Sequence, residues 1–524
     1  MKFVSDPPIS VKIRKMKQRV RWHDPLILER GIDQTRMVLD INDADNPEFS
    51  FLVVGDSGAG QHRGYNPQRQ IAELMLSQRD TSQFVLHTGD VIYLVGSSEY
   101  YQKNFISPYR EFLVGGENYE KIAYDRMVFN MPFLPVLGNH DYYDLPWLFG
   151  MMAGGTRPLR RLIWSKIDFD IGWQGSGQGN VYARAFLDYL TAFNNREELG
   201  RHLDRHYTAK TTTGQCLRYE PEHFTRLPNR YYTFRCGGID FFALDTNTFN
   251  APSPLPATQE GDELRRQLTK RREELDRSEE KILDACERLS PNQLDEAEIL
   301  DDHRAQLEQI EEEKLDIEKR LTANKNVVID FEQLDWLKER LIESWHTKDV
   351  RGRVLYFHHP PYVTEATKWD QAQTMEVRYH LRRVLDAVAE AVGELAQGRP
   401  IVDLVLTGHA HCLEHLQTDD TGHADSHINW IVCGGSGYSL RRQRSEGSQL
   451  KEFFRNNEGG YTRQVAQSLL FVGRHSHGSK KRRPYSFIRV DVKAGCPPKF
   501  IVRPFIAERF RHEWKNTHLE PFAI

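Results

Sequence analysis

Five short groups of residues that can bind metals recur along this chain of 524 residues. They supply carboxylate, amide, phenol and imidazole groups, which suit hard or borderline cations such as Fe, Mn, Zn or Mg, and none supplies a thiolate. Seven candidate ligands are too many for one ion and favour two ions that share a bridging carboxylate. The groups are Gly55-Asp56-Ser57-Gly58, Gly89-Asp90-Val91-Ile92-Tyr93, Gly138-Asn139-His140-Asp141, His358-His359-Pro360-Pro361 and Gly408-His409-Ala410-His411.

A short apolar run precedes each group. Continuous hydrophobicity is typical of a strand in a sheet that is covered on both faces. Each group therefore follows the carboxyl end of a buried strand, where open α/β sheets build their sites. Together the five groups predict hydrolysis of a phosphate ester by two metal ions. The runs are 51–54, 84–86, 134–137, 354–357 and 401–406.

This set of motifs resembles the calcineurin-like metallophosphoesterase superfamily. Most of its members carry a histidine two residues after the first aspartate, where this chain has Gly58. Tyr93, three residues after Asp90, makes the pattern similar to the purple acid phosphatases in particular. The resemblance implies that Asp56, Asp90, Tyr93 and His411 bind one metal, and that Asp90, Asn139, His358 and His409 bind the other. Because a phenolate favours ferric iron, the implied cofactor is Fe(III) with a divalent Fe, Mn or Zn ion.

The resemblance also implies roles for three residues beside the ligands. A hydroxide held by the metals would attack phosphorus, and His140 would stabilise or protonate the leaving oxygen. Asp141 would orient the His140 imidazole and keep it protonated. His359 would reach the substrate phosphate, or would instead bond to nearby backbone. Tyr93 has an alternative as well, as a wall of the pocket rather than a ligand.

The implied fold is of the α/β (α+β) class, a four-layer sandwich of two mixed β-sheets between helices. We expect an N-terminal extension at 1–50, a metallophosphoesterase domain at 51–505 and a C-terminal tail at 506–524. Two insertions interrupt that domain. The first, 146–235, follows His140 closely and is expected to form a wall or lid of the cleft.

The second insertion, 256–326, predicts an antiparallel helical hairpin. Apolar residues recur every seven positions in each half, and charged residues fill most other positions. Pro291 marks the turn between the halves. The hairpin is interpreted as a self-contained surface arm, or alternatively as an arm for self-association or partner docking. The repeating positions are Leu268, Leu275, Ile282 and Leu289, then Leu300, Leu307, Lys314 and Leu321.

Composition favours a cytoplasmic globular enzyme. No apolar run approaches the ~20 residues that span a bilayer, and the six cysteines lack paired spacing, which suggests reduced thiols. A net charge of −4 gives no whole-chain reason to expect nucleic acid as a partner. Basic runs at 12–21, 441–444 and 480–483 are the only hints of an anionic partner, and each is interpreted first as a solvated face.

Three functions remain open from the sequence. The first is a phosphomonoesterase acting on a phosphorylated small molecule or protein. The second is a phosphodiesterase acting on cyclic nucleotides, glycerophosphodiesters or nucleic acid, because the same metal core serves both reactions. The third is a docking or assembly protein that acts through the hairpin, although a scaffold has no need of a complete ligand set.

Overall fold

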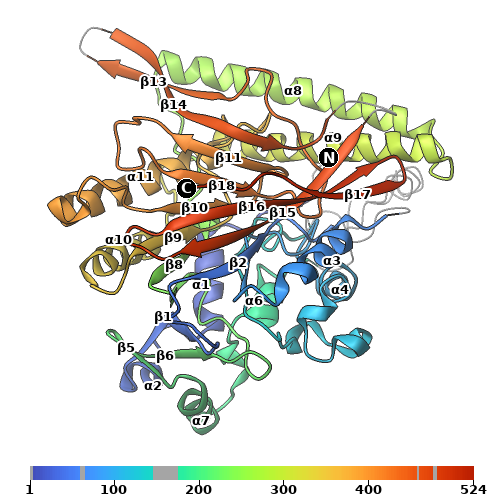
Figure 1. Cartoon of the computed structure of the whole chain (residues 1–524). Helices are drawn as coiled ribbons and strands as arrows, with labels where there is room; N and C mark the ends of the chain where they lie inside the picture. Colours follow the sequence, from blue (N-terminus) through green and yellow to red (C-terminus); the bar gives the residue numbers. More distant parts are fainter. Residues whose placement is uncertain (1–3, 60–64, 146–174, 457–458, 476–480) are drawn as a thin grey trace.

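Two mixed β-sheets stack face to face and helices cover their outer faces (Figure 1). This architecture, seen in a computed structural model of the chain, confirms the predicted fold class. The structure describes residues 4–59, 65–145, 175–456, 459–475 and 481–524.

The smaller sheet has the order β17-β16-β15-β2-β3-β4, and β18 pairs with the edge of β16. Its parallel half consists of β2 (Phe49–Val54), β3 (Val85–His87) and β4 (Phe133–Pro135). The C-terminal strands run antiparallel beside β2, so the first motif lies in the middle of the sheet. These strands are β15 (Arg482–Lys493), β16 (Lys499–Phe510), β17 (Glu513–His518) and β18 (Phe522–Ala523).

The larger sheet has the order β13-β14-β11-β12-β10-β9-β8-β7-β1-β6-β5. Its centre is parallel, since β8 (Ile239–Ala243), β9 (Gly352–Tyr356), β10 (Leu404–Thr407) and β12 (Asn429–Cys433) all run the same way. The remaining strands are β1 (Ile32–Leu39), β5 (Ala209–Thr211), β6 (Gly214–Tyr219), β7 (Tyr232–Cys236), β11 (Leu413–Thr418), β13 (Gln449–Asn456) and β14 (Gly459–Val472).

Alternating side chains of the central strands define the layers. Phe241 and Val354 point into the core between the sheets, while the next residues, Phe242 and Leu355, pack under α10 (Phe331–His346) and α11 (Ala372–Val392). On the other outer face, α3 (Pro67–Arg79) packs against the smaller sheet. The other short helices are α1 (Ile9–Arg19), α2 (Pro25–Glu29), α4 (Ser98–Tyr101), α6 (Asn180–Phe186) and α7 (Arg196–His206).

Both predicted ends of the domain differ from the structure. Residues expected to form an extension build α1, α2 and β1, and β1 pairs with β6 and β7 inside the larger sheet. The expected tail likewise builds part of β16 and all of β17 and β18. The described residues 4–50 and 506–524 therefore belong to the sandwich itself. The sequence did not indicate these elements, because they are short, polar loops surround them, and neither end of the chain carries a metal-binding motif.

The second insertion forms two helices of 29 residues each, α8 (Gln259–Glu287) and α9 (Leu294–Thr322). Apolar residues at the predicted positions pack between them, including Leu268 and Leu275 against Ile310 and Ile317. The hairpin lies against the rest of the chain, since α9 runs along the sandwich (Figure 1). Charged side chains of α9 pair with the body, as in the contacts of Glu312 with Lys368 and of Glu298 with Arg509.

The first insertion is described only from residue 175 onward. That part supplies α6, α7 and the two strands β5 and β6 at the edge of the larger sheet. Residues 146–174 of the expected wall or lid lie outside the described residues.

Candidate metal centre

The five predicted loops converge at one end of the two sheets. Asp56 follows β2, Asp90 follows β3, Asn139 follows β4, His358 follows β9, and His409 follows β10. At Asp56, Asp90 and His409 the backbone is left-handed, with φ of 54°, 54° and 65°. Such conformations cost energy in a non-glycine residue and are typical of functional sites.

Four of the predicted ligands surround one position. The Tyr93 hydroxyl lies 2.9 Å from Oδ1 of Asp56, 2.8 Å from Oδ2 of Asp90 and 3.1 Å from Nε2 of His411. In His411, Nδ1 lies 3.0 Å from the carbonyl oxygen of Ser439, which leaves Nε2 directed at the other three groups. A backbone carbonyl on the far nitrogen is the usual support of a metal-binding histidine.

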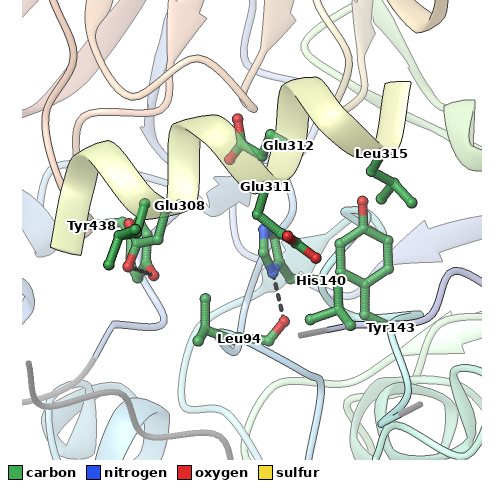
Figure 2. A pocket seen from close by; sticks show the side chains of 10 residues that line it. Leu94, His140, Tyr143, Glu308, Glu311, Glu312, Leu315 and Tyr438 are labelled. Carbon is green, nitrogen blue, oxygen red and sulfur yellow. Dashed lines mark hydrogen bonds between the residues drawn. The ribbon is translucent and has the colours of Figure 1, made fainter. Parts of the chain in front are cut away.

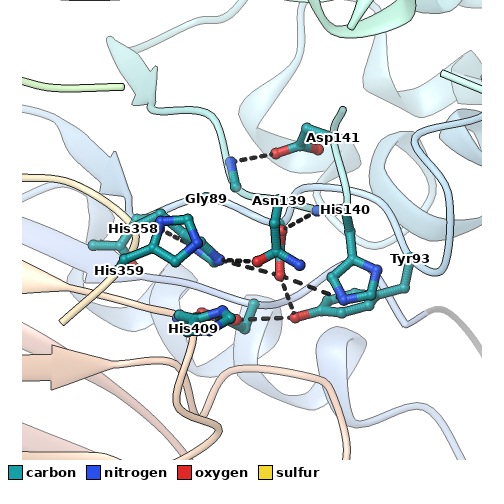
Figure 3. A network of polar contacts seen from close by, with 12 residues as sticks. Gly89, Tyr93, Asn139, His140, Asp141, His358, His359 and His409 are labelled. Carbon is teal, nitrogen blue, oxygen red and sulfur yellow. Dashed lines mark hydrogen bonds and ion pairs between the residues drawn. The ribbon is translucent and has the colours of Figure 1, made fainter. Parts of the chain in front are cut away.

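A second position adjoins the first across Asp90. Nε2 of His358 lies 2.9 Å from Oδ1 of Asn139 and 3.3 Å from Oδ2 of Asp90, while Nδ1 donates to the carbonyl of Thr88 at 2.8 Å (Figure 3). His409 completes the set, with a ring centroid 5.0 Å from that of His358. Two triads can be formed in which the three ligand atoms lie within 4.8 Å of one another. One consists of Asp56, Asp90 and His358, and the other of His358, His359 and His409. Asp90 is thus placed to bridge the two positions.

At Gly58 the loop after Asp56 leaves no room for a side chain. A Cβ atom at this position would lie 2.1 Å from the carbonyl oxygen of Val91 and 2.5 Å from Cα of Ile92. No side chain fits there, and the Tyr93 hydroxyl reaches Asp56 from the following loop.

The electrostatics of the cluster fit a bound cation. Burial raises the pKa of Asp56 well above its ordinary value, and the charge of Asp90 raises it further. Burial and the two carboxylates likewise raise the pKa of Tyr93. Metal ions reverse both effects, because they stabilise carboxylate and phenolate ligands. In addition, Nδ2 of Asn139 is buried without a hydrogen-bond partner, as expected where the amide oxygen is reserved for another contact.

His140 lies beside the centre but is not arranged as expected. Its backbone N–H donates to Oδ1 of Asp90 at 2.9 Å, and Nδ1 donates to the carbonyl of Leu94 at 2.6 Å. Nε2 is therefore the nitrogen that faces the centre, 4.0 Å from Oδ2 of Asp90. The predicted pairing with Asp141 is wrong. That carboxylate accepts the backbone N–H groups of Gly138 and Val91, so it holds the two motif loops together.

His359 bonds to side chains rather than to backbone acceptors. Nδ1 lies 2.7 Å from Oγ1 of Thr246 and Nε2 lies 3.4 Å from Nδ2 of Asn250. Burial and the charge of His358 lower the pKa of His359 well below its ordinary value. Because the His359 ring is neutral and belongs to the same triad as His358 and His409, it is better suited to the second metal position than to binding a phosphate.

Two site residues carry no signal in the sequence. Nζ of Lys368 lies 3.1 Å from Nε2 of His409, and Nε2 of Gln373 lies 2.7 Å from the same atom. Lys368 lies in the segment before α11 and Gln373 lies in the first turn of α11, and neither belongs to a ligand motif. A lysine beside a histidine ligand is suited to bind an anion that reaches the metals.

A helix covers the mouth of the centre. His140, Leu94 and Tyr143 face Glu308, Glu312 and Leu315 of α9 across a small cavity (Figure 2). The cavity volume is about 30 Å³. Sites that bind ligands usually offer roughly 300–1,000 Å³. A cavity of this size has no room for a phosphate ester.

Similarity to known proteins is distant. No protein-family model matches the chain, and no curated protein matches it. Solved structures that resemble it include GAP50, described as the anchor in the inner membrane complex of Plasmodium, at 13% identity and a TM-score of 0.35, over 90% of this chain and 89% of that one.

Two further solved structures also resemble the chain. Purple acid phosphatase PPD1 from yellow lupin seeds has 12% identity and a TM-score of 0.38, over 92% of this chain and 54% of that one. PhoD has 12% identity and a TM-score of 0.38, over 92% of this chain and 70% of that one. At these values the overall likeness does not bear on function. Within the described residues, no helix is long and apolar enough to cross a membrane.

Proposed function

We propose that this chain is a binuclear metal-dependent hydrolase of phosphate esters that acts as a phosphomonoesterase. One observation carries the proposal: seven donors from five loops far apart in sequence converge around Asp90, with the Tyr93 hydroxyl between two carboxylates. A purely structural cluster would not bury two carboxylates beside each other without a cation, since the mutual repulsion is costly.

The chain's own groups have separable tasks in this reaction. Two bound metal ions would neutralise the phosphate charge and supply an activated water. His140 presents Nε2 toward the centre and is fixed by Leu94, so it is placed to stabilise or protonate the leaving oxygen. Lys368 would hold a phosphate oxygen beside His409.

We infer that the position beside Tyr93 prefers ferric iron. A phenolate ligand gives an iron protein a visible charge-transfer band, and Tyr93→Phe would remove that band. Iron-loaded protein would be examined by absorption spectroscopy and its metal content measured. Tyr438→Phe is the matched control, because the Tyr438 ring stacks on Tyr93 at 3.8 Å while its hydroxyl bonds to Glu308 instead of the ligands. A band unchanged in Tyr93→Phe would contradict the assignment.

The monoesterase assignment is tested with two chromogenic substrates. Hydrolysis of p-nitrophenyl phosphate and of bis-p-nitrophenyl phosphate would be compared on metal-reconstituted protein at several pH values. A preference for the monoester supports the proposal, and a preference for the diester moves the enzyme to the phosphodiesterase class. No turnover of either substrate with both metals bound would overturn the hydrolase proposal and favour a docking or assembly role through the hairpin.

The phosphodiesterase alternative has one observation in its favour. Lys368, Arg441 and Lys481 lie in a row that begins beside His409 and pair with carboxylates of α9, and such a row would bind an extended anion.

Our proposal places the enzyme in a reducing compartment such as the cytoplasm, because the six cysteines form no disulfide with one another and five of them are buried. Fractionation of native cells, followed by detection of the protein, tests the location.

A further inference from the structure

Helix α9 carries a stripe of carboxylates that faces the body along much of its length. Glu298, Asp302, Glu308, Glu312 and Asp316 recur at helical spacing and span about 27 Å at 1.5 Å per residue. Each contacts the sandwich or a residue of its loops. This stripe is the surface through which the hairpin contacts the body.

Cations of the body stand opposite this stripe and are almost completely buried by it. At one end Lys368 contacts Glu312 at 2.7 Å and lies against the metal ligand His409. Next along the row, Arg441 lies 3.7 Å from Glu312 and donates to the carbonyl of Ala305. The row therefore begins at the metal centre.

The row of cations continues away from the centre along the antiparallel strands β15 and β16 and the segment that precedes them. Arg474 and Lys481 both pair with Asp302. Arg483 and Arg509 contact Glu298 at 2.6 and 2.8 Å. Burial keeps these side chains in place, since the exposed fraction of the Lys481, Arg483 and Arg509 side chains is 4%, 7% and 4%.

The carboxylates of α9 do not use all the donors in this row. Nη2 of Arg441, Nε of Arg474 and Nη1 of Arg509 are buried without a hydrogen-bond partner. A buried donor without a partner destabilises the folded protein. Phosphate groups, with more acceptor oxygens than a carboxylate, would satisfy such donors better.

The hairpin has its own apolar core, and that core does not depend on the body. Cys286 packs against Leu300 and Leu307, and Leu268 and Leu275 pack against residues of α9. Toward the body, by contrast, most of the named contacts of α9 are ionic or hydrogen-bonded. Separation of the hairpin would therefore leave its helices paired and would break contacts that water and salt can replace.

We propose that α9 is a displaceable cover over a cation-lined groove that binds a chain of phosphate groups, and that its carboxylates occupy the places of those phosphates. The groove runs from Lys368 to Arg509 and leads into the metal centre. The cavity of about 30 Å³ under α9 leaves no room for substrate until the cover lifts. The inference rests on the proposed function only where it assigns the bound chain as substrate.

Two triple variants with equal change of net charge test the groove. Glu298→Gln/Asp302→Asn/Glu312→Gln removes carboxylates that pair with the row. Glu263→Gln/Glu274→Gln/Glu313→Gln removes carboxylates whose partners, Arg266 and Arg271, belong to the hairpin itself. Binding of a fluorescent oligothymidylate of about 12 nucleotides would be followed by anisotropy, and unlabelled linear polyphosphate would compete with it.

The first triple is expected to bind the oligonucleotide at least about tenfold more tightly than the natural chain, and the second to remain within about twofold of it. If both triple variants bind the oligonucleotide more tightly to the same extent, the cause is a general effect of net charge. If neither binds it, the row of cations serves only as a structural contact. Either result overturns the proposal. Competition at equal phosphate concentration identifies the source, because polyphosphate displaces the oligonucleotide only if the phosphate chain alone is recognised.

A measurement on the natural chain needs no variant. Linear polyphosphate should raise the hydrogen exchange of α9 and its sensitivity to protease, because polyphosphate and the carboxylates of α9 compete for the same cations. Orthophosphate at equal phosphate concentration should have neither effect. Unchanged exchange under saturating polyphosphate would overturn the proposal. If the chain binds polyphosphate but hydrolyses neither nitrophenyl ester, the groove proposal stands and the hydrolase proposal is refuted. If it hydrolyses an ester but shows none of these binding changes, the hydrolase proposal stands and the groove proposal is refuted.

Discussion

At the scale of single residues, the centre depends on side chains whose positions the backbone dictates. Asp56 and Asp90 adopt left-handed conformations, and Tyr93 reaches both carboxylates from the loop after Asp90. The seven residues that we propose as ligands could be chosen from the sequence, because their five motifs follow apolar runs that become strands. The sequence could not predict Lys368 or Gln373, since contact with His409 depends on how α11 docks.

His140 offers the first residue-scale prediction. His140→Ala should lower kcat by about 10²–10⁴, a typical contribution of a general acid, and should leave both metals bound. Metal analysis and steady-state kinetics on the loaded enzyme measure the two effects. Loss of metal together with activity would show that His140 is a ligand.

Asp141→Asn should lower activity as well, but through misplacement of Gly138 and Val91, whose backbone N–H groups donate to the Asp141 carboxylate.

Gly58 offers a second prediction. Gly58→Ala places a Cβ atom 2.1 Å from the carbonyl oxygen of Val91 and should destabilise the protein by more than about 1 kcal/mol. Gly200→Ala is the control, because Gly200 lies within α7, its nearest neighbour is the flexible end of Arg30 at 3.2 Å, and alanine favours a helix. Denaturant unfolding compares the two. Equal stability of both variants would show that the loop can move away from residue 58.

At the scale of elements, a buried ion network joins the end of β8 to the start of α10. Arg230 contacts Asp245 at 3.3 Å and also pairs with Asp330, the residue that caps α10. The Gln333 side chain accepts from the backbone N–H of Asp245 at 2.8 Å. This network fixes the loop that carries Thr246, the partner of His359.

Removal of Arg230 tests that network. Arg230→Ala should cost about 3–5 kcal/mol of unfolding free energy, because two buried carboxylates lose their cation. Arg235→Ala on the neighbouring strand β7 is the matched control and should cost about 0–1 kcal/mol. The Arg235 side chain is 42% exposed, against 1% for Arg230. Similar losses in both variants would contradict a special role for the buried network.

The hairpin illustrates what sequence patterns leave open at this scale. Heptad spacing predicted two paired helices, and Leu268, Leu275, Ile310 and Ile317 form the expected apolar core. The same spacing says nothing about the outer face of each helix. Glu298 and Glu312 look like any exposed glutamates in a charged helix, and only the fold brings Arg509 and Lys368 opposite them.

At the scale of the whole molecule, buried histidines make stability depend on pH. Burial, together with the charge of Arg383, lowers the pKa of His380 from 6.5 to about 4. Between these values the unfolded chain binds a proton that the folded chain does not. The contribution of His380 to stability is therefore present above pH 6.5 and is lost as the pH falls toward 4.

Substitution of His380 tests this dependence. Relative to the natural chain, His380→Leu should gain roughly 2–3 kcal/mol of unfolding free energy on going from about pH 7.5 to about pH 4.5. Chemical denaturation at both pH values measures the difference. His346→Leu, at the exposed end of α10, serves as the control. Parallel pH profiles for the natural chain and His380→Leu would show that His380 does not titrate between folded and unfolded states.

The strand order of the smaller sheet has a consequence for how the protein is made. β2, which ends just before Asp56, lies between β3 and β15, and β15 begins only at Arg482. A ribosome releases the chain from its N-terminus, so β2 must wait for more than four hundred further residues before its antiparallel neighbour exists. Such long-range pairing is slow. The strand before the first ligand thus gains its last neighbour near the end of translation, and metal loading is expected to follow synthesis rather than accompany it.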